Sequence, residues 1–306
     1  MLKIDLSKTV IVTLIMLLIT LLINFLPFMV LFIAPFLLLP TVYLFCKSRK
    51  SYYVMSTIII LITVFMSIFT MQVMMSAIFA GYIIGQLLHE KTSRERMLYI
   101  LTVFYSIYTL ISVIFLQLTD YLPKVQTWFK PTLNIYNDYL SKGVKDGTLS
   151  VHQLELFNNS MNDLIKQVPG IVIFLLFLLA LIQLLITMPL LRRFKIATPN
   201  FKPLYSWQFP KVLLIIYLIT LLAHFGITET DYVALGIVIN LRYVIEWLFF
   251  IQGLSLYHYF MRIRKTHTVL NVFVFFIAVI YSPITQLFGM IDLMINLKKR
   301  IPVKRK

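Results

Sequence analysis

The sequence predicts an all-α protein, a polytopic bundle of transmembrane helices with nine or ten membrane segments. Three observations support this fold class. Apolar and aromatic residues make up 60% of the 306 residues. Charged residues make up only 13%, against about 25% in an average soluble domain. The apolar residues also fall into long runs, with the charged residues between them. A soluble fold of this size could not bury so much apolar surface, so a soluble enzyme, a secreted domain and a disordered chain are all disfavoured.

The N-terminal membrane half, residues 1–118, is expected to hold five spans. A helix needs about 17–25 apolar residues to cross the bilayer, so the run 9–46 fits two spans, with the break at Asn24 and Pro27. Proline breaks a helix because it lacks the backbone donor. The run 52–88 is divided near Gln72 in the same way. The expected spans are about 9–26, 28–46, 52–69, 71–88 and 97–118.

Residues 119–168 form the one long polar segment, and the number of preceding spans places it outside the cell. Five basic and five acidic residues give this segment no net charge. Apolar residues at helical spacing predict two amphipathic helices on the outer surface, and Ser150 with Gln153 matches a capping box at the start of the second. The segment is either a lid over an external vestibule or a packed cap with no moving role.

The C-terminal membrane half, residues 169–297, is expected to hold five further segments. The expected segments are about 169–190, 211–226, 232–260, 268–282 and 284–297. The last two are interpreted as a short hairpin or a re-entrant pair that turns at Pro283. A single span there would leave the strongly basic tail, 298–306, outside the cell. Ten crossings are therefore preferred to nine.

The basic residues predict the orientation of the chain. Of the 28 lysines and arginines, 22 lie in the N-terminal segment, in alternate loops and in the tail, which share one face if every span crosses. By the positive-inside rule this face is cytoplasmic, with both termini inside. The net charge of +16 therefore reflects topology. Anionic lipid headgroups at the cytoplasmic face are the expected partner, and no nucleic acid is expected.

Four residues are candidates for a ligand-binding site or a polar core. Asn240, Arg242 and Glu246 lie near the middle of the segment 232–260, where a charge costs about 2.5–3.5 kcal/mol. Arg242 and Glu246 are four residues apart, so they share a helix face and can pair. The alternative is an internal ion pair that only joins helices.

The fourth candidate, Asp292, is the only acid in the last apolar stretch. It is a partner for Arg242, a second polar site, or an interfacial carboxylate paired with Lys299 or Asn296. The lone glutamines within spans, Gln72 and Gln183 among them, are expected to join helices by hydrogen bonds.

The sequence contains no motif that indicates an enzyme. Walker A, His-Glu-x-x-His and Gly-x-Ser-x-Gly patterns are absent. The five histidines are dispersed, and Cys46 is the single cysteine. No catalytic residue, metal ligand or cofactor is therefore expected.

Three short motifs resemble a known family. Trp207 to Pro210 precedes a span, Gln252-Gly-Leu-Ser-Leu-Tyr257 closes the long segment, and Gly289-Met-Ile-Asp292 precedes the basic tail. With the length and hydropathy, these motifs resemble the YybS-like family of predicted bacterial membrane proteins. The resemblance implies the plasma membrane of a Gram-positive bacterium. It also implies a distant similarity to the substrate-binding S components of energy-coupling-factor transporters, although the Ala-x-x-x-Ala docking motif of those proteins is absent from the first span.

Two functions remain open. The first is small-molecule binding or transport, as in an S component, with the polar centre of the segment 232–260 as its site. The second is a non-catalytic scaffold or an assembly partner of another membrane protein. The small-xxx-small pattern of Gly81 and Gly85 allows a close helix crossing, either within the chain or with such a partner.

Overall fold

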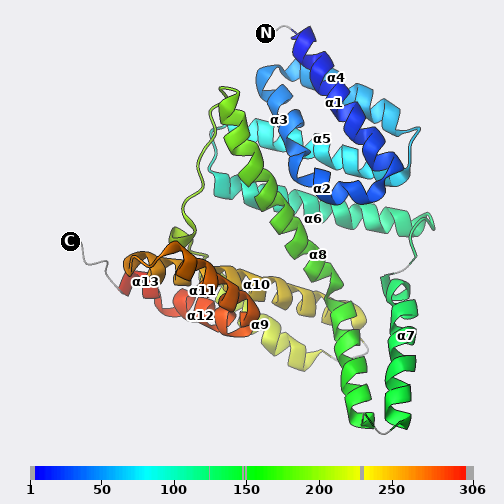
Figure 1. The fold of residues 1–306 in the computed structure, drawn as a ribbon, viewed down its shortest axis with the longest axis vertical. Helices are drawn as coiled ribbons and strands as arrows, with labels where there is room; N and C mark the ends of the chain where they lie inside the picture. The colour runs from blue at the N-terminus through cyan, green and yellow to red at the C-terminus, as the bar shows by residue number, and fades with distance from the viewer. Residues whose placement is uncertain (1–3, 124, 147, 149, 228–230, 301–306) are drawn as a thin grey trace. The chain divides into compact units, whose positions relative to one another are not determined.

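The structure is a computed structural model, and it describes residues 4–123, 125–146, 148, 150–227 and 231–300. These residues form α-helices and short 3-10 turns and no strand, which confirms the predicted all-α class. The chain divides into two compact units (Figure 1). The first unit comprises Met1–Leu122 and Leu175–Phe201, and the second comprises Pro123–Phe174 and Lys202–Lys306.

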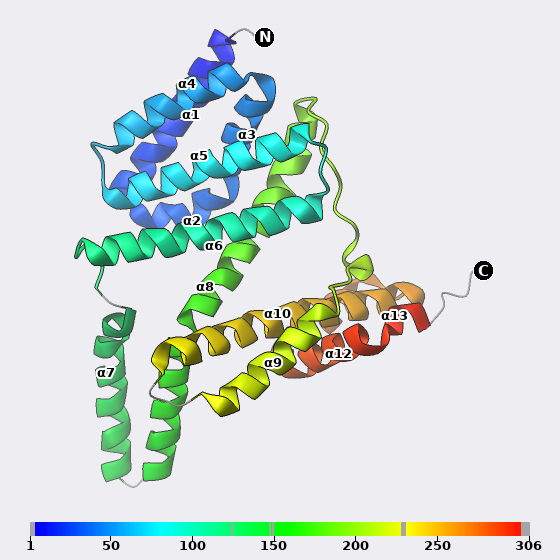
Figure 2. The same cartoon turned by 180° about the vertical axis from the view of Figure 1, so that it is seen from behind.

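The first unit is a helical bundle with a large apolar core. Its helices are α1 (Leu6–Phe25), α3 (Leu38–Lys47), α4 (Arg49–Thr63), α5 (Ile68–His89), α6 (Arg94–Leu118) and the second half of α8 (Val151–Arg193). Met16, Ile23, Met55 and Ile59 are fully buried in the core. Helices α5 and α6 lie side by side in both views (Figures 1 and 2).

The crossing of α3 and α5 uses the two glycines of the small-xxx-small pattern. A Cβ atom on Gly81 would overlap the side chain of Thr41, and one on Gly85 would overlap the ring of Phe45. The pattern therefore serves an internal crossing of this chain, which was one of the two expected uses.

The span expected over residues 28–46 coincides with a broken helix. After α1 the chain forms η1 (Pro27–Met29), α2 (Val30–Ile33) and η2 (Ala34–Phe36) before α3 begins. The two parts, Pro27–Phe36 and Leu38–Lys47, meet at a bend of 44°. Pro27 and Pro35 both lack the backbone N–H group that a continuous helix needs. Pro27 was expected to break the helix, and Pro35 adds the second interruption.

The second unit is built around α10 (Tyr232–Ile263). It also contains α7 (Val125–Lys145), the first half of α8, η3 (Leu204–Ser206), α9 (Val212–Gly226), α11 (Thr268–Ile280), α12 (Ser282–Ile295) and α13 (Leu297–Arg300). Helices α10 and α12 approach until their backbones touch. A Cβ atom on Gly289 would overlap the carbonyl oxygen of Phe249, and one on Gly253 would overlap that of Thr285.

Helix α8 differs from the prediction. The second amphipathic helix and the span at 169–190 were expected to be separate, but α8 runs through Pro169 and Gly170 as one helix of 43 residues. Its length is about 65 Å, roughly twice the hydrocarbon core of a bilayer. Its first half lies beside α7 in both views (Figures 1 and 2), and the rings of Tyr136 and Phe157 meet there.

Length and composition mark the chain as a multi-pass membrane protein. Within the described residues, five helices are long and apolar enough to cross, namely α1, α5, α6, α8 and α10, and the number is up to seven if each of two bent helix pairs is one span. Helices α4 and α9 have only 15 residues each. The count of nine or ten crossings therefore stays a prediction.

The basic residues of the first unit gather at one end of its bundle, which we call its basic end. Three contacts define it: Asp5 N–H donates to Ser51 Oγ at 3.1 Å, Lys47 Nζ to Phe194 O at 3.1 Å, and Arg49 Nη2 to Gln86 Oε1 at 3.0 Å. They join the ends of α1, α3, α4, α5 and α8. The loops that were expected to share a face thus lie together, and their cytoplasmic location stays a prediction.

The second unit has a corresponding basic end. The guanidinium of Arg262 lies 3.9 Å from the ring centre of Tyr205. Lys298 Nζ donates to Trp207 O at 2.6 Å, and Lys211 Nζ donates to Met294 O at 3.1 Å. The loop after α10 and the residues after α12 therefore meet at the same end of this unit.

Three helices that end at these basic ends do so in the same way. Lys91, Lys195 and Lys265 follow α5, α8 and α10 in the left-handed conformation, with φ of 54°, 59° and 50°. In each case the next N–H bonds the carbonyl five residues back, as in a Schellman motif. Glycine is the usual residue there, but a lysine also complements the negative end of the helix dipole.

Helices α11 and α12 have the geometry expected of a re-entrant pair. Helices α11 and α12 meet at a bend of 101°. They have 13 and 14 residues, so each is about 20 Å long, against about 30 Å for the hydrocarbon core. The pair begins after Arg262 and ends beside Lys298, both at the basic end of the second unit. This placement favours two arms that enter the membrane and return.

Candidate functional site

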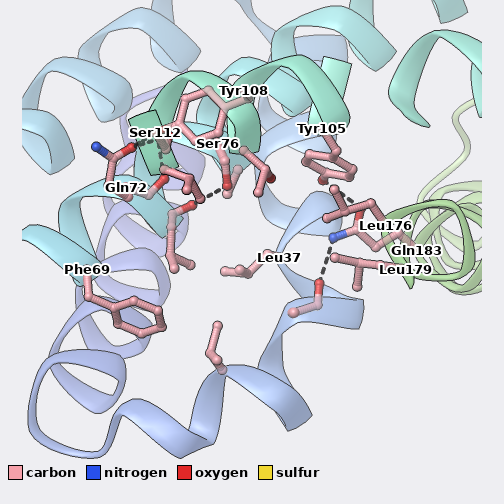
Figure 3. Close-up of a pocket in the computed structure, with 16 residues that line it drawn as sticks. Leu37, Phe69, Gln72, Ser76, Tyr105, Tyr108, Ser112, Leu176, Leu179 and Gln183 are labelled. Carbon is pink, nitrogen blue, oxygen red and sulfur yellow. Dashed lines mark hydrogen bonds between the residues drawn. The ribbon is translucent and has the colours of Figure 1, made fainter. Parts of the chain in front are cut away.

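A cavity of about 260 Å³ lies in the first unit beside the broken helix (Figure 3). Its lining comes from α2 and η2, from α5, from α6 and from the second half of α8. Most of the lining is apolar, with Phe69 on one side and Leu176 and Leu179 on the other. We refer to it below as the cavity.

Gln183 bonds to the broken helix at one edge of the cavity. Its Nε2 donates to the carbonyl oxygen of Ala34 in η2 at 2.8 Å, and its Oε1 accepts from the hydroxyl of Tyr105 at 2.7 Å. Gln183 and Tyr105 are 2% and 5% exposed. The glutamine thus joins α8 to α6 and to the broken helix, the helix-joining role expected for it.

A second polar edge is formed by α5 and α6. The hydroxyl of Tyr108 shares its one hydrogen between the backbone oxygen of Gln72 at 2.9 Å and the Gln72 Oε1 at 2.7 Å, and Ser112 Oγ donates to the same Oε1 at 2.8 Å. Ser76 Oγ donates to Val73 O at 2.7 Å. A hydroxyl has one hydrogen and two lone pairs, so these three hydroxyls still offer acceptor positions. Figure 3 shows them grouped on one side of the cavity.

The lining of the cavity carries no charge. None of the residues that line it is Asp, Glu, Lys, Arg or His. Among the described residues there is also no group of three or more His, Cys, Asp or Glu placed to hold a metal ion. The chemistry of the lining therefore suits an uncharged molecule with an apolar body and a polar group.

The cavity lies away from the basic end of the first unit. Phe69, Gln72 and Ser76 are in the first half of α5, whose other end is His89. The neighbouring connection is fixed by Asn24, whose Oδ1 accepts from Ser67 N–H at 3.0 Å. If the basic end is cytoplasmic, the cavity lies in the outer half of the membrane.

The four residues predicted as a polar core lie in the second unit and do not form one site. Asn240 joins α10 to α8. Its Oδ1 accepts from Gly170 N–H at 2.6 Å, and its Nδ2 donates to Lys166 O at 2.9 Å. These two backbone groups are one helical turn apart, at the position of Pro169. Asn240 thereby holds α8 to α10 through the pair of backbone groups next to Pro169.

Arg242 and Glu246 pair along α10, as their spacing predicted. Arg242 Nε lies 3.6 Å from Glu246 Oε1, and the two side chains are 28% and 29% exposed. The hydroxyl of Tyr217 on α9 donates to the same carboxylate oxygen at 3.4 Å. The arrangement fits an ion pair that joins α9 and α10, and a ligand role for it stays a prediction.

Asp292 is not a partner of Arg242. It is fully buried, and its carboxylate accepts from Gln252 Nε2 at 2.5 Å and lies 3.6 Å from Lys298 Nζ. Neither Lys299 nor Asn296, the partners expected for an interfacial carboxylate, supplies these contacts. The charge of Lys298 reaches Asp292 because α13 turns back over α12.

Some of the residues that line the cavity could be recognised in the sequence. Gln72 and Gln183 were visible as isolated polar residues in apolar segments. Tyr105, Tyr108 and Ser112 were missed, although their spacing of three and four residues places them on one helix face. A polar stripe of this kind along an apolar span was the available signal.

The two helical units, the apolar helices and the uncharged cavity define a polytopic α-helical membrane protein. The chain belongs to the DUF2232 family of predicted membrane proteins, whose model matches residues 10–293. It is also similar to the uncharacterized protein YybS of Bacillus subtilis (strain 168), with 24% identity over 208 residues, which covers 67% of this chain and 66% of that protein. These matches confirm the resemblance that the motifs indicated. No solved structure matches the chain.

Proposed function

We propose that this protein binds a small uncharged molecule in the cavity of the first unit and acts as a binding or transport component. The observation that carries the proposal is a cavity of about 260 Å³ that joins an apolar lining to two polar edges without any charge. Ligand sites in proteins have this composition, with an apolar wall and a few placed polar groups. The volume suits a ligand of one or two rings.

The polar edges indicate which group the ligand presents. Tyr108, Ser112 and Ser76 commit their hydrogens to Gln72 and Val73. Their remaining lone pairs accept hydrogen bonds. A ligand with an N–H or O–H donor fits this wall better than one with only acceptors.

The broken helix supports a role in transport. Discontinuous helices commonly form the substrate sites of membrane transporters, and here α2 and η2 line the cavity. The resemblance to S components agrees with such a role, and the absent Ala-x-x-x-Ala motif argues against the same coupling subunit. We propose no enzymatic activity, since the polar lining pairs no nucleophile with a general base.

A cavity-filling variant tests the proposal. Ser112→Phe places a ring in the cavity, and Ile111→Phe is the matched control, because Ile111 is 61% exposed on the same helix. The measurement is native mass spectrometry of protein gently extracted from its own membrane. We expect a retained small molecule in wild type and in Ile111→Phe, and none in Ser112→Phe.

Two results would contradict the proposal. One is wild type that retains no small molecule, and the other is equal retention in both variants. Retention of a stoichiometric membrane protein instead would favour the scaffold function.

A further inference from the structure

Arg94 is a buried arginine whose guanidinium is only partly satisfied. It is the first residue of α6, and it is 5% exposed. Its guanidinium carbon lies 4.5 Å from the ring centre of Phe201. Its Nε and Nη2 are enclosed and have no hydrogen-bond partner in the described part of the chain.

A second arginine increases the positive charge at this position. Arg192, in the last turn of α8, lies close enough to repel Arg94 electrostatically, whereas Glu95 attracts it. Arg192 itself donates from Nε to Thr198 Oγ1 at 2.7 Å and from Nη2 to Pro199 O at 3.1 Å. These acceptors are neutral, so they do not compensate the second charge.

The energetics require a further partner for Arg94. A buried charge without a hydrogen-bonded counter-charge costs several kcal/mol, while stacking on an aromatic ring returns only about 0.5–2 kcal/mol. An anion with two or more oxygens would satisfy Nε and Nη2 together, because the planar guanidinium matches phosphate and carboxylate groups in a bidentate way.

The location favours phosphate. Arg94 begins a helix of 25 residues, and helix N-termini attract anions. It lies at the basic end of the first unit, which Lys47 and Arg49 also occupy. If that end is cytoplasmic, it is at the depth of anionic lipid headgroups.

We propose that Arg94 and Arg192 form a phosphate-binding site at the basic end of the first unit. The phosphate belongs either to a phospholipid headgroup or to a soluble phosphate compound. Nε and Nη2 are enclosed, so binding requires the atoms that surround them to shift. The site is separate from the cavity, and it does not depend on the function proposed for the cavity.

Charge-matched variants test this site. Arg94→Gln and Arg192→Gln each remove one guanidinium of the site. Arg96→Gln is the control, because Arg96 is exposed, lies two residues further along α6 and carries the same charge. Arg192 is also exposed, so its variant serves even if Arg94→Gln does not fold. The probes are phosphatidylglycerol, phosphatidylcholine and inorganic phosphate, added to the purified full chain.

Native mass spectrometry measures the bound lipid, and thermal unfolding measures the response to phosphate. We expect wild type and Arg96→Gln to retain phosphatidylglycerol. Arg94→Gln and Arg192→Gln should each bind it about tenfold more weakly, which corresponds to a loss of about 1.4 kcal/mol in binding free energy. A preference for phosphatidylglycerol without a response to phosphate identifies a lipid site, and stabilisation by phosphate alone identifies a soluble ligand. Equal binding by all variants, or a wild type that binds neither phosphatidylglycerol nor inorganic phosphate, overturns the proposal.

Discussion

At the scale of single residues, lone polar side chains stabilise interruptions in apolar helices. Gln183 binds a carbonyl of the broken helix, and Asn240 binds the two backbone groups around Pro169. The identity of these residues was visible in the sequence. Their partners were not, because the bonds join residues 149 and 70 positions apart.

Gln183→Leu tests the first of these roles. The substitution leaves the buried Tyr105 hydroxyl without its acceptor, while the Ala34 carbonyl keeps the 3.3 Å bond from Leu37 N–H. A buried unsatisfied group costs about 1–3 kcal/mol. We expect a lower midpoint of thermal unfolding in detergent. Tyr105→Phe in the Gln183→Leu background should restore part of the loss, and a double variant that is strictly additive would contradict the assigned hydrogen bond.

The ammonium of Lys298 provides a pH-dependent prediction. Burial lowers the pKa of Lys298, and the nearby Asp292 carboxylate acts in the opposite direction. The folded pKa therefore lies below the unfolded value of about 10.5, so the unfolded chain holds the proton more tightly. Wild type should gain stability relative to Lys298→Met as the pH rises from the folded pKa toward 10.5.

Thermal unfolding of both proteins between neutral pH and about 10.5 measures this gain. Below the folded pKa the difference between the two proteins should not change, since Lys298 is then charged in both the folded and the unfolded state. A difference that stays constant over the whole range would refute the prediction.

At the scale of helices, the hydropathy pattern predicted which segments form helices better than it predicted the residues at which those helices begin and end. The apolar runs predicted helices that the structure contains, but the bend between α2 and α3 within the expected span 28–46 was not predicted, and α8 continues through Pro169. Proline lacks one backbone donor and disfavours a helix, but contacts from elsewhere in the fold can hold the helix together. Beside Pro169, Asn240 of α10 bonds Gly170 N–H and Lys166 O, a contact that local sequence cannot show.

The crossing of α10 and α12 gives a prediction at this scale. Gly289→Ala should destabilise the protein strongly, because the new methyl group overlaps the Phe249 carbonyl and must separate two helices. Gly236→Ala is the matched control, since no atom lies within 4 Å of a Cβ there. It should raise stability by up to about 1 kcal/mol.

Chemical denaturation in mixed micelles would compare the two variants. Equal effects of both substitutions would show that the backbones do not touch at this crossing.

At the scale of the whole molecule, the distribution of basic residues predicted which loops lie together but did not indicate the cavity. The basic loops were grouped correctly within each unit, because the positive-inside rule needs only the order of spans and charges. The cavity forms where α2, η2, α5, α6 and α8 come together. No single segment of the sequence shows that these elements are neighbours.

Cysteine labelling tests the orientation. In a Cys46→Ser background, Ser150→Cys should react with a maleimide that cannot cross the membrane, while Lys8→Cys and Lys299→Cys should react only after the membrane is opened. External reaction at position 299 would indicate an odd number of crossings.

The short arms of α11 and α12 also have a consequence for biogenesis. Neither arm is long enough to be inserted as an independent span. Helix α12 packs closely on α10 at Gly253 and Gly289, so its binding surface exists only once α10 is in place. The pair should therefore enter the bilayer after α10, as a folding step on an existing helix. If the basic end of the second unit is cytoplasmic, residues 297–300 then never have to be translocated, and this part of the chain can complete its fold from the side on which it was synthesised.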